Sequence, residues 1–342
     1  MVGVSYTPTL DQSTMPTRRR VRPASAVLVW TAILILYVVW GSTYLGIRIA
    51  VATIPPFVLA ATRFAIAGIV MLVAVAVIRR GAIPRPTLRQ WRDSAIIGAL
   101  LMGGGMGAVA WGEQTVPSGM AGLLIAMMPV WVAVLGRIFF GDRLPRVAVA
   151  GIAIGMLGVA ILVGQGVVID RSLDPAGVVG LIISPIAWSA GSLYSTHGAD
   201  LPDDPFVTTG MEFVSGAAVL AAMSAVSGEL ASFQPAAVSA NSAIAFAYLT
   251  VVGSLVAFTA FAWVLRQAPL PLIATYAFVN PVIAVFLGWL ILSEPVAPVQ
   301  LIAGAVTVVG VALIILARSR MPAARQPAAR AVDRLGNDEL AA

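Results

Sequence analysis

Two ionisable residues, Arg63 and Glu212, lie inside long apolar segments of this 342-residue chain. A charged side chain in such a segment is costly and marks a cavity, an ion pair or a proton pathway. The two residues align in an internal repeat, and helix geometry predicts depths that differ by only about 6 Å. Two interpretations stay open: a structural ion pair, or an acid that exchanges Arg63 for a proton or a cationic solute.

Aromatic and polar side chains in the apolar segments are candidates for lining a solute cavity. Their rings can enclose an apolar or aromatic solute, or bind a cation through their π faces. Trp and Tyr also gather at headgroup depth, and this alternative stays open for Trp111 and Trp263, near segment ends. Trp40, Trp188 and Tyr276 lie deeper, which favours a cavity. The candidate set is Trp40, Tyr44, Arg63, Trp111, Glu113, Gln114, Trp188, Glu212, Trp263, Tyr276 and Asn280.

Three of the polar residues each have two interpretations. Glu113, beside Gln114 at the end of the third apolar segment, could gate release or carry a proton, or be a solvated loop acid. Asn280 could hydrogen-bond a solute or the carbonyl that the following proline leaves free. Arg48 could bind a carboxylate, but snorkelling to the surface is the interpretation we favour.

Residues for other kinds of chemistry are missing. The chain has no Cys and one His, which excludes a disulfide, a thiolate nucleophile and a metal site built on two histidines. His197 and the acids at 200, 203 and 204 are predicted to form a hydrated loop without a metal. No phosphate-binding G-x-x-x-x-G-K-[ST] sequence occurs, which excludes an ATP-driven pump within the chain. We predict neither an enzyme nor a cofactor.

The apolar segments that carry these residues are predicted membrane spans. Apolar residues make up 59% of the chain and charged residues 11%, against about 25% charged residues in soluble domains. The basic residues form short Arg clusters between the apolar segments, which argues against a nucleic-acid partner. Because about 20 apolar residues cross the bilayer as a helix, we predict an all-α integral membrane fold. Its ten transmembrane helices are expected at 26–47, 55–78, 94–112, 117–136, 147–168, 175–196, 206–228, 242–264, 269–291 and 298–317.

The placement of arginine predicts that both termini are cytoplasmic. With the N-terminus inside, 18 of the 21 basic residues fall in cytoplasmic segments, and only Arg171 falls in an outer loop. Residues 1–25 and 318–342 are then polar cytoplasmic tails.

The chain repeats itself at an offset of about 150 residues. Residues 111–136 align with residues 263–288 without a gap, which pairs Pro129 with Pro281 in the middle of two spans. A proline there removes a backbone donor and bends its helix. A symmetric pair of bends suits a gated cavity, and prolines that are merely tolerated are the alternative.

Each half, 26–168 and 175–317, has five predicted spans, so the second half enters the membrane upside down relative to the first. Secondary transporters use such inverted repeats, with a substrate site near the bilayer midplane and access that alternates between the two sides. We therefore expect a small-molecule substrate, with protons as a candidate coupling ion. A scaffold or sensor subunit that transports nothing is the alternative, and both a monomer and a homodimer stay open.

Several segments resemble one family, the EamA-type drug/metabolite exporters. WGSTYLGIR at 40–48 resembles the opening of that family's first span. Three further stretches resemble its second, fourth and ninth spans, at 55–64, 116–144 and 275–295. Asp142 stands where the family usually has Glu in the first connector. These sequence motifs are most similar to those of the YedA-like branch of bacterial permeases.

The resemblance covers about residues 27–317. It implies two EamA domains, a place in the inner membrane, and export of small metabolites or drugs, with amino acids or related amphipathic solutes as candidates. Import of the same solutes remains an alternative.

Overall fold

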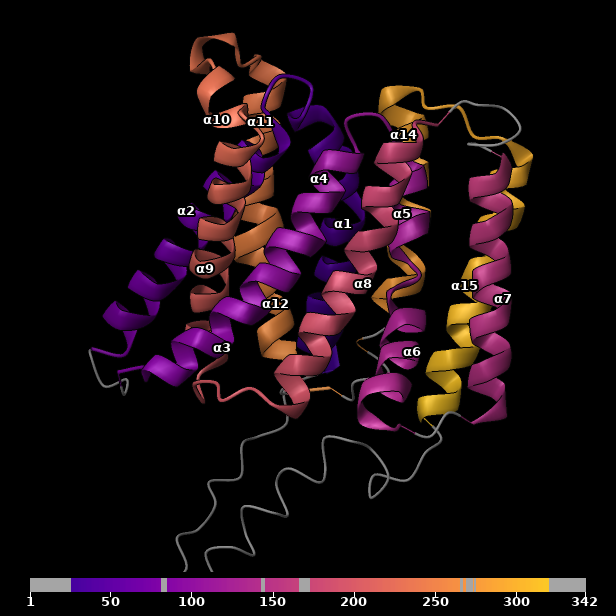
Figure 1. The fold of residues 1–342 in the computed structure, drawn as a ribbon, viewed down its shortest axis with the longest axis horizontal. Coiled ribbons are helices and arrows are strands. Elements are labelled where there is room, and N and C mark those ends of the chain that lie inside the picture. The colour runs from indigo at the N-terminus through magenta and orange to yellow at the C-terminus, as the bar shows by residue number, and fades with distance from the viewer. Residues whose placement is uncertain are drawn as a thin grey trace, which may run out of the picture.

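The structure is a computed structural model in which all described elements are helices (Figure 1). Most of the predicted tails, 1–25 and 318–342, lies outside the described residues. Those residues are 26–80, 85–142, 145–165, 173–264, 267–268, 273 and 275–319.

The first half of the chain crosses the molecule five times. Its third crossing joins two α-helices through a π-helical stretch, and its fourth is broken into two helices. The elements are α1 (Ala26–Ala50), α2 (Pro56–Ile78), α3 (Leu88–Gly98), η2 (Ala99–Gly107), α4 (Ala108–Gly112), α5 (Ser118–Ile125), α6 (Met128–Phe140) and α7 (Arg146–Val163).

The second half repeats this order and adds two short helices in one loop. Among the described residues, nine helical stretches are long and apolar enough to span a membrane, and Val279–Leu292 is a shorter one. Part of the span predicted at 269–291, residues 269–272 and 274, lies outside the described residues. The elements are α8 (Pro175–His197), α9 (Pro205–Val226), α10 (Glu229–Ser232), η4 (Pro235–Ala237), α11 (Ala240–Tyr248), η5 (Leu249–Val256), α12 (Ala257–Val264), α14 (Tyr276–Leu292) and α15 (Pro298–Ser319).

Proline and aspartate set the starts of two helices. α8 and α9 each begin with a proline, whose fixed φ suits the first helical turn. The preceding Asp174 accepts a hydrogen bond from the backbone nitrogen of Gly177 at 3.0 Å. Asp204 likewise accepts one from Phe206 at 2.9 Å. Because its charged form accepts bonds from Gly177 and Thr115, the pKa of Asp174 lies below its ordinary value.

Helices of the two halves pair with each other. α2 packs on α9 and α7 packs on α15. α1 contacts α11, η5 and α12 in the way that α8 contacts α3, η2 and α4, and the contact of α1 with α14 matches that of α8 with α6. Matched contacts of this kind follow from an inverted repeat. The predicted all-α membrane fold of ten helices in two inverted repeats is confirmed.

Glycines allow the closest helix approach, between α7 and α15. A Cβ built on Gly151 would lie 2.6 Å from the carbonyl oxygen of Gly310, and one built on Gly158 would lie 2.7 Å from the backbone nitrogen of Thr307. Side chains at these positions would push the helices apart, as is usual where small residues form a contact within a membrane. The Gly151–Gly158 face is therefore a packing surface.

The two π-helical stretches, η2 and η5, occupy equivalent places in the two halves. Each lies in the middle of a crossing, between two α-helices, and packs against the first helix of the other half. π-Helical geometry is rare and is frequent at functional sites. The hydrophobic pattern gave no sign of it, because a π-helix and an α-helix bury almost the same set of residues.

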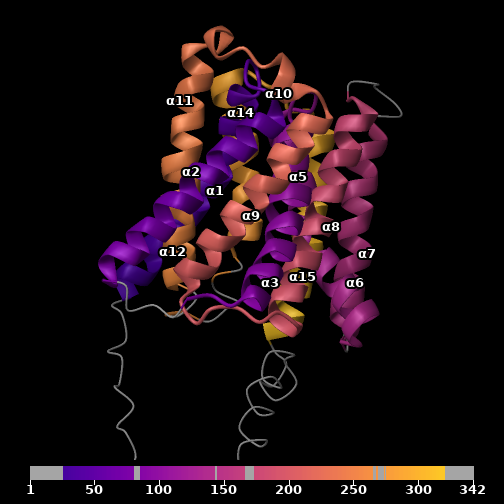
Figure 2. The same cartoon turned by 60° about the vertical axis from the view of Figure 1, so that its left-hand side comes forward.

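The chain ends and one loop lie on opposite faces. Because the number of crossings is even, α1 begins and α15 ends on the same side, called here the termini face. Both views place α3, α6 and α12 toward that face, and α10 and α11 toward the other, called here the loop face (Figures 1 and 2).

Candidate functional site

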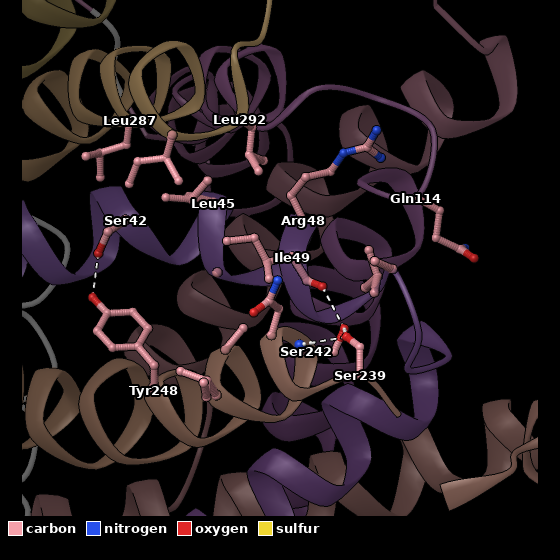
Figure 3. Close-up of a pocket in the computed structure, with 17 residues that line it drawn as sticks. Ser42, Leu45, Arg48, Ile49, Gln114, Ser239, Ser242, Tyr248, Leu287 and Leu292 are labelled. Atoms are coloured by element: carbon pink, nitrogen blue, oxygen red, sulfur yellow. Dashed lines mark hydrogen bonds between the residues drawn. The ribbon is translucent and has the colours of Figure 1, made fainter. Parts of the chain in front are cut away.

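A groove with a volume of about 960 Å³ lies between α1, α11 and α14, in the half of the molecule toward the loop face (Figure 3). Apolar side chains form most of its wall. Its polar lining residues are Ser42, Arg48, Gln114, Ser239, Asn241, Ser242 and Tyr248. A concave, mainly apolar site with a few convergent polar groups is typical of small-molecule binding.

One face of α1 supplies the floor of the groove. Ser42, Leu45, Gly46 and Ile49 follow one another at intervals of three, one and three residues and lie on one side of the helix. A Cβ built on Gly46 would lie 3.0 Å from the Leu249 side chain, so glycine lets the crossing formed by α11, η5 and α12 approach α1 here. The sequence analysis did not predict this groove, although its floor follows the WGS motif directly.

Hydroxyl groups join the walls at two places. The Ser42 and Tyr248 hydroxyl oxygens are 2.6 Å apart and connect α1 to α11 (Figure 3). Ser242, also on α11, donates to the carbonyl oxygen of Ile49 at 3.0 Å. These bonds hold α11 against α1 along the length of the groove.

Arg48 and Gln114 lie together at one end of the groove (Figure 3). A terminal guanidinium nitrogen of Arg48 donates to the backbone carbonyl of Glu113. Arg48 is half-buried and lines the groove instead of extending over an open surface, which differs from the interpretation favoured from the sequence.

The carboxyl group of Glu113, directly after the end of α4, is buried and has no partner among the described residues. Its exposed fraction is 0%, and neither of its oxygens has a hydrogen bond. Burial raises the pKa of Glu113 well above its ordinary value, nearby Glu294 adds to the rise, and Arg48 opposes it. The alternative of a solvated loop acid therefore does not fit the structure.

Glu294 caps the broken fourth crossing from the other half of the chain. Its carboxylate accepts hydrogen bonds from the backbone nitrogen and hydroxyl of Ser118, at 2.9 and 3.0 Å, and from the backbone nitrogen of Gly119, at 3.1 Å. A carboxylate at a helix start satisfies free N–H groups and interacts well with the helix dipole. The sequence pairs Glu294 with Asp142 in the repeat, but nothing in it indicates this cap.

Trp40 and Tyr276 come together in an aromatic cluster nearer the termini face. The Trp40 ring centroid lies 5.0 Å from Tyr276, 5.1 Å from Phe261 and 5.3 Å from Phe258. Trp263 is half-buried and packs in the same apolar core. These rings lie outside the set that lines the groove.

Arg63 and Glu212 do not form the predicted ion pair. Arg63 has an exposed fraction of 3% and donates from Nε to the Ser254 hydroxyl at 2.8 Å, while no ion pair involves Glu212 among the described residues. The next residues, Phe64 and Phe213, meet between α2 and α9 instead, with ring centroids 5.1 Å apart. Neighbouring side chains on a helix point about 100° apart. Similar depth in the membrane therefore did not imply that the Arg63 and Glu212 side chains point toward each other.

The remaining aromatic candidates are spread over the molecule. Trp111 is exposed, at 36%, and covers Gly180 on α8. Trp188 is half-buried against Gly105 in η2. Tyr44 is half-buried, on the side of α1 that faces α5. The structure therefore does not bring the predicted set together in one cavity.

The two prolines differ in their surroundings. Pro129 is the second residue of α6 and follows the break after α5, whereas Pro281 lies inside the continuous α14. Asn280 beside it is buried. With its amide nitrogen facing two carbonyls, Asn280 donates to Tyr276 and Tyr37, at 3.2 Å each. Its side chain thus joins α14 to α1.

At the position equivalent to the groove, toward the termini face, Asp93 connects the start of α3 to α8. The Asp93 carboxylate has an exposed fraction of 0% and accepts bonds from the Tyr194 hydroxyl at 3.0 Å and the Asp200 backbone nitrogen at 2.8 Å. Arg92 forms an ion pair with it at 2.7 Å. The sequence analysis missed Asp93; its signal was an acid directly before the third predicted span, which begins at residue 94.

An aromatic contact joins α6 to α8 in the same region. The rings of Phe140, at the end of α6, and His197, at the end of α8, are stacked with centroids 4.1 Å apart. His197 also bonds through Nδ1 to the carbonyl oxygen of Leu193 at 3.0 Å. The end of α8 is therefore held to both α3 and α6.

Comparison with known proteins shows the family. The model of the EamA-like transporter family matches the chain twice, over residues 28–164 and 175–316. The uncharacterized inner membrane transporter YedA of Escherichia coli K12 is 34% identical over 293 residues, which cover 85% of this chain and 92% of YedA. A probable terminal-alkyne amino-acid exporter of Streptantibioticus cattleyicolor is 25% identical, with 84% of this chain and 92% of that protein covered.

A solved structure, described only as the crystal structure of a protein, has a similar fold. Its TM-score is 0.58 at 23% sequence identity, and the match covers 86% of this chain and 98% of that one. The twice-matched family model, the YedA similarity and the apolar helices identify a multi-pass inner membrane transporter and not an enzyme. The chain belongs to the EamA-like transporter family.

Proposed function

We propose that this transporter exports small amphipathic metabolites or drugs, amino-acid-like solutes among them, by alternating access between its two inverted repeats. The observation that carries the proposal is the unequal state of two equivalent places. A groove lies between α1, α11 and α14, whereas at the equivalent place between α8, α3 and α6 the buried Asp93 carboxylate bonds to Tyr194 and to the Asp200 backbone, and we interpret this second place as the closed side. An alternating-access transporter closes one side of its site while the other is open.

The direction follows from arginine placement. If the Arg-rich termini face is cytoplasmic, the groove opens toward the outside, and the structure corresponds to the release state of an exporter. Similarity to a probable terminal-alkyne amino-acid exporter supports this direction.

We also propose that Glu113 carries the coupled proton. Its carboxyl group is buried without a hydrogen-bond partner among the described residues, and Arg48, which lines the groove, bonds to its backbone carbonyl. Binding of a solute at Arg48 would move that contact and change the environment of the acid. Glu212, which also lacks an ion pair in the described part of the chain, is the alternative proton carrier.

Reconstitution into vesicles tests the export proposal. Purified protein is inserted into lipid vesicles loaded with a mixture of amino acids, apolar amines and dyes, and solute loss is measured with and without a pH gradient. We expect vectorial loss of at least one solute that accelerates when the outer side is acidic. Retention of every solute class in vesicles with correctly folded protein would favour a scaffold role.

A further inference from the structure

Two guanidinium groups beside the groove have no carboxylate partner. Among the described residues, no acid forms an ion pair with Arg48 or with Arg63. Arg stays charged at any physiological pH, and a cation removed from water is costly unless an anion accompanies it. Within a membrane protein such residues mark a solute pathway.

Arg48 is the cation within the groove. Among the described residues its guanidinium bonds to one backbone carbonyl, that of Glu113, so most of its five N–H donors remain for another acceptor. The Glu113 carboxyl group is fully buried and does not line the groove. The described lining of the groove contains no acidic side chain at all, so nothing there would attract a cationic solute.

Arg63 lies behind the far end of the groove. Its Nε bonds to the Ser254 hydroxyl at 2.8 Å, and a Cβ built on Gly253 would lie 3.2 Å from both Nη2 of Arg63 and Cγ2 of Thr43. Arg63 thus lies where α1 meets η5, about one π-helical turn from Tyr248. Tyr248 bonds to Ser42, the neighbour of Thr43 in the chain.

We propose that the groove binds a small amphipathic monocarboxylate, whose anionic group binds Arg63 first and Arg48 after the Ser42–Tyr248 hydrogen bond opens. Guanidinium groups bind carboxylates through paired, charge-assisted hydrogen bonds. The two hydroxyls lie between the two cations and can donate to the carboxylate as it passes. The assignment rests on the export proposal and adds to it the charge of the substrate.

The apolar wall selects the rest of the molecule. Leu45 and Ile49 line it from α1, Ile244 from α11, and Leu287 and Ile291 from α14. A volume of about 960 Å³ accommodates a solute of drug size. An aromatic or aliphatic body therefore packs on this wall while the carboxylate lies against an arginine.

A matched pair of probes tests the charge. N-Acetyl-L-phenylalanine has a carboxylate and an apolar ring, and its amide has the same shape without the charge. Binding of each to the full-length protein is measured by titration calorimetry in nanodiscs of phosphatidylcholine. We expect the carboxylate to bind at least tenfold more tightly than the amide.

Three variants locate the effect. Arg48→Gln and Arg63→Gln should each remove most of the preference for the carboxylate, whereas Arg137→Gln, an exposed position on α6, should keep it. Arg63→Lys serves if the glutamine variant does not fold, and it should keep a reduced preference because the cation remains but the planar fork is lost. Equal binding of the two probes, or a preference unchanged in the Arg48 and Arg63 variants, would overturn the proposal.

A second titration distinguishes binding of a solute from binding of a lipid. An anionic headgroup offers the same chemistry as a carboxylate, and the groove also has exposed apolar residues, Ile244 and Ile291. The titration is therefore repeated with phosphatidylglycerol in the nanodisc. Loss of all carboxylate binding there, together with Arg48-dependent retention of phosphatidylglycerol, would assign the groove to lipid and overturn the proposal.

Flux distinguishes this inference from the export proposal. Carboxylate binding at Arg48 without any vesicle flux would support the proposed binding site and contradict the export proposal. Equal export of the carboxylate and the amide would keep export and remove the charge assignment.

Discussion

The groove between α1, α11 and α14 and its counterpart between α8, α3 and α6 are built from equivalent helices in opposite orientation. In the first, a cavity of about 960 Å³ separates α11 from α14. In the second, Asp93 connects the start of α3 to α8 and to the backbone after it, and Phe140 stacks on His197. The backbone repeat thus supplies two equivalent places, which differ in the side-chain contacts that the structure shows there.

The side-chain contacts at the two places differ. Asp93 accepts bonds from Tyr194 and from the Asp200 backbone, whereas Ser242 beside the groove donates a single bond to a carbonyl of α1. A buried carboxylate with three partners is a stronger connection than a hydroxyl, because hydrogen bonds to charged groups are about twice as strong. The opposite charges of Arg63 and Glu212 add a second asymmetry in the middle of the molecule.

Of the substitutions proposed here, removal of the Asp93 carboxylate should have the largest effect on access to this side and on export. Asp93→Ala breaks the bonds to Tyr194 and to the backbone of Asp200, at a cost of about 3 kcal/mol to the closed state. Because the chain has no cysteine of its own, Leu193→Cys, a buried position on α8, reports the opening. We expect rapid maleimide labelling and at least a tenfold loss of export.

The control for this experiment is Asp200→Ala. The Asp200 side chain has only a long ion pair with Arg89, at 3.9 Å, and its backbone bond to Asp93 survives the substitution. Slow labelling in both variants would show that Asp93 does not close this side.

Glu113→Gln should remove the response of export to a pH gradient. Glutamine keeps the shape of the side chain but cannot carry a proton. Since burial raises the pKa of Glu113 well above its ordinary value, the protonated fraction and with it the wild-type rate should fall as the outer pH rises. Export by the variant is measured in vesicles from pH 6 to 8 and is expected to be flat.

Glu212→Gln is the matched variant in the other half. A flat pH profile in Glu212→Gln with a normal one in Glu113→Gln would move the proton from Glu113 to Glu212. In that case Glu212, which aligns with Arg63 in the repeat, would couple the proton to transport, and Glu113 would not.

Glu294→Ala should destabilise the half toward the loop face by about 2 kcal/mol, because α5 loses a cap of three hydrogen bonds. The change in unfolding is followed by tryptophan fluorescence during heating. Asp142→Ala, at the equivalent position of the first half, gives the comparison. An equal loss in unfolding temperature for Glu294→Gln, which keeps hydrogen-bonding ability, would argue against the cap.

Trp40→Ala should raise the half-saturation concentration of export severalfold. The ring supports Tyr276 and two phenylalanines on the side of α1 toward the termini face, where an exported solute would pass before it reaches the groove. Kinetics are measured over a range of solute concentrations in the vesicles. Wild-type kinetics in a folded variant would exclude Trp40 from the solute path.

The smallest effect is expected for Trp111→Phe. Trp111 is exposed at 36% and covers a glycine of α8, outside the groove. Export and unfolding temperature should both stay within error of the wild type. A marked rise in the half-saturation concentration would instead place the solute near α4.

The positions of the helices could be predicted from the sequence, and those of the side-chain contacts could not. The apolar lengths, the matched Pro129 and Pro281 and the odd number of spans in each half predict the inverted repeat. Gln114 was predicted and lies at the groove, while Ser42 and Tyr248 were missed because hydroxyls in a span are common. The match of Arg63 with Glu212 predicted a contact that the neighbouring phenylalanines take instead.

The sequence by itself determined the membrane fold, the repeat and the family, because these depend on the order and length of apolar segments. The tertiary structure decided that Arg63 bonds to Ser254 and that Glu294 caps Ser118. Each of these contacts joins residues more than 170 positions apart in the chain. Such contacts depend on how each helix is rotated about its axis, and hydrophobic patterns fix that rotation poorly when both lipid and protein surroundings are apolar.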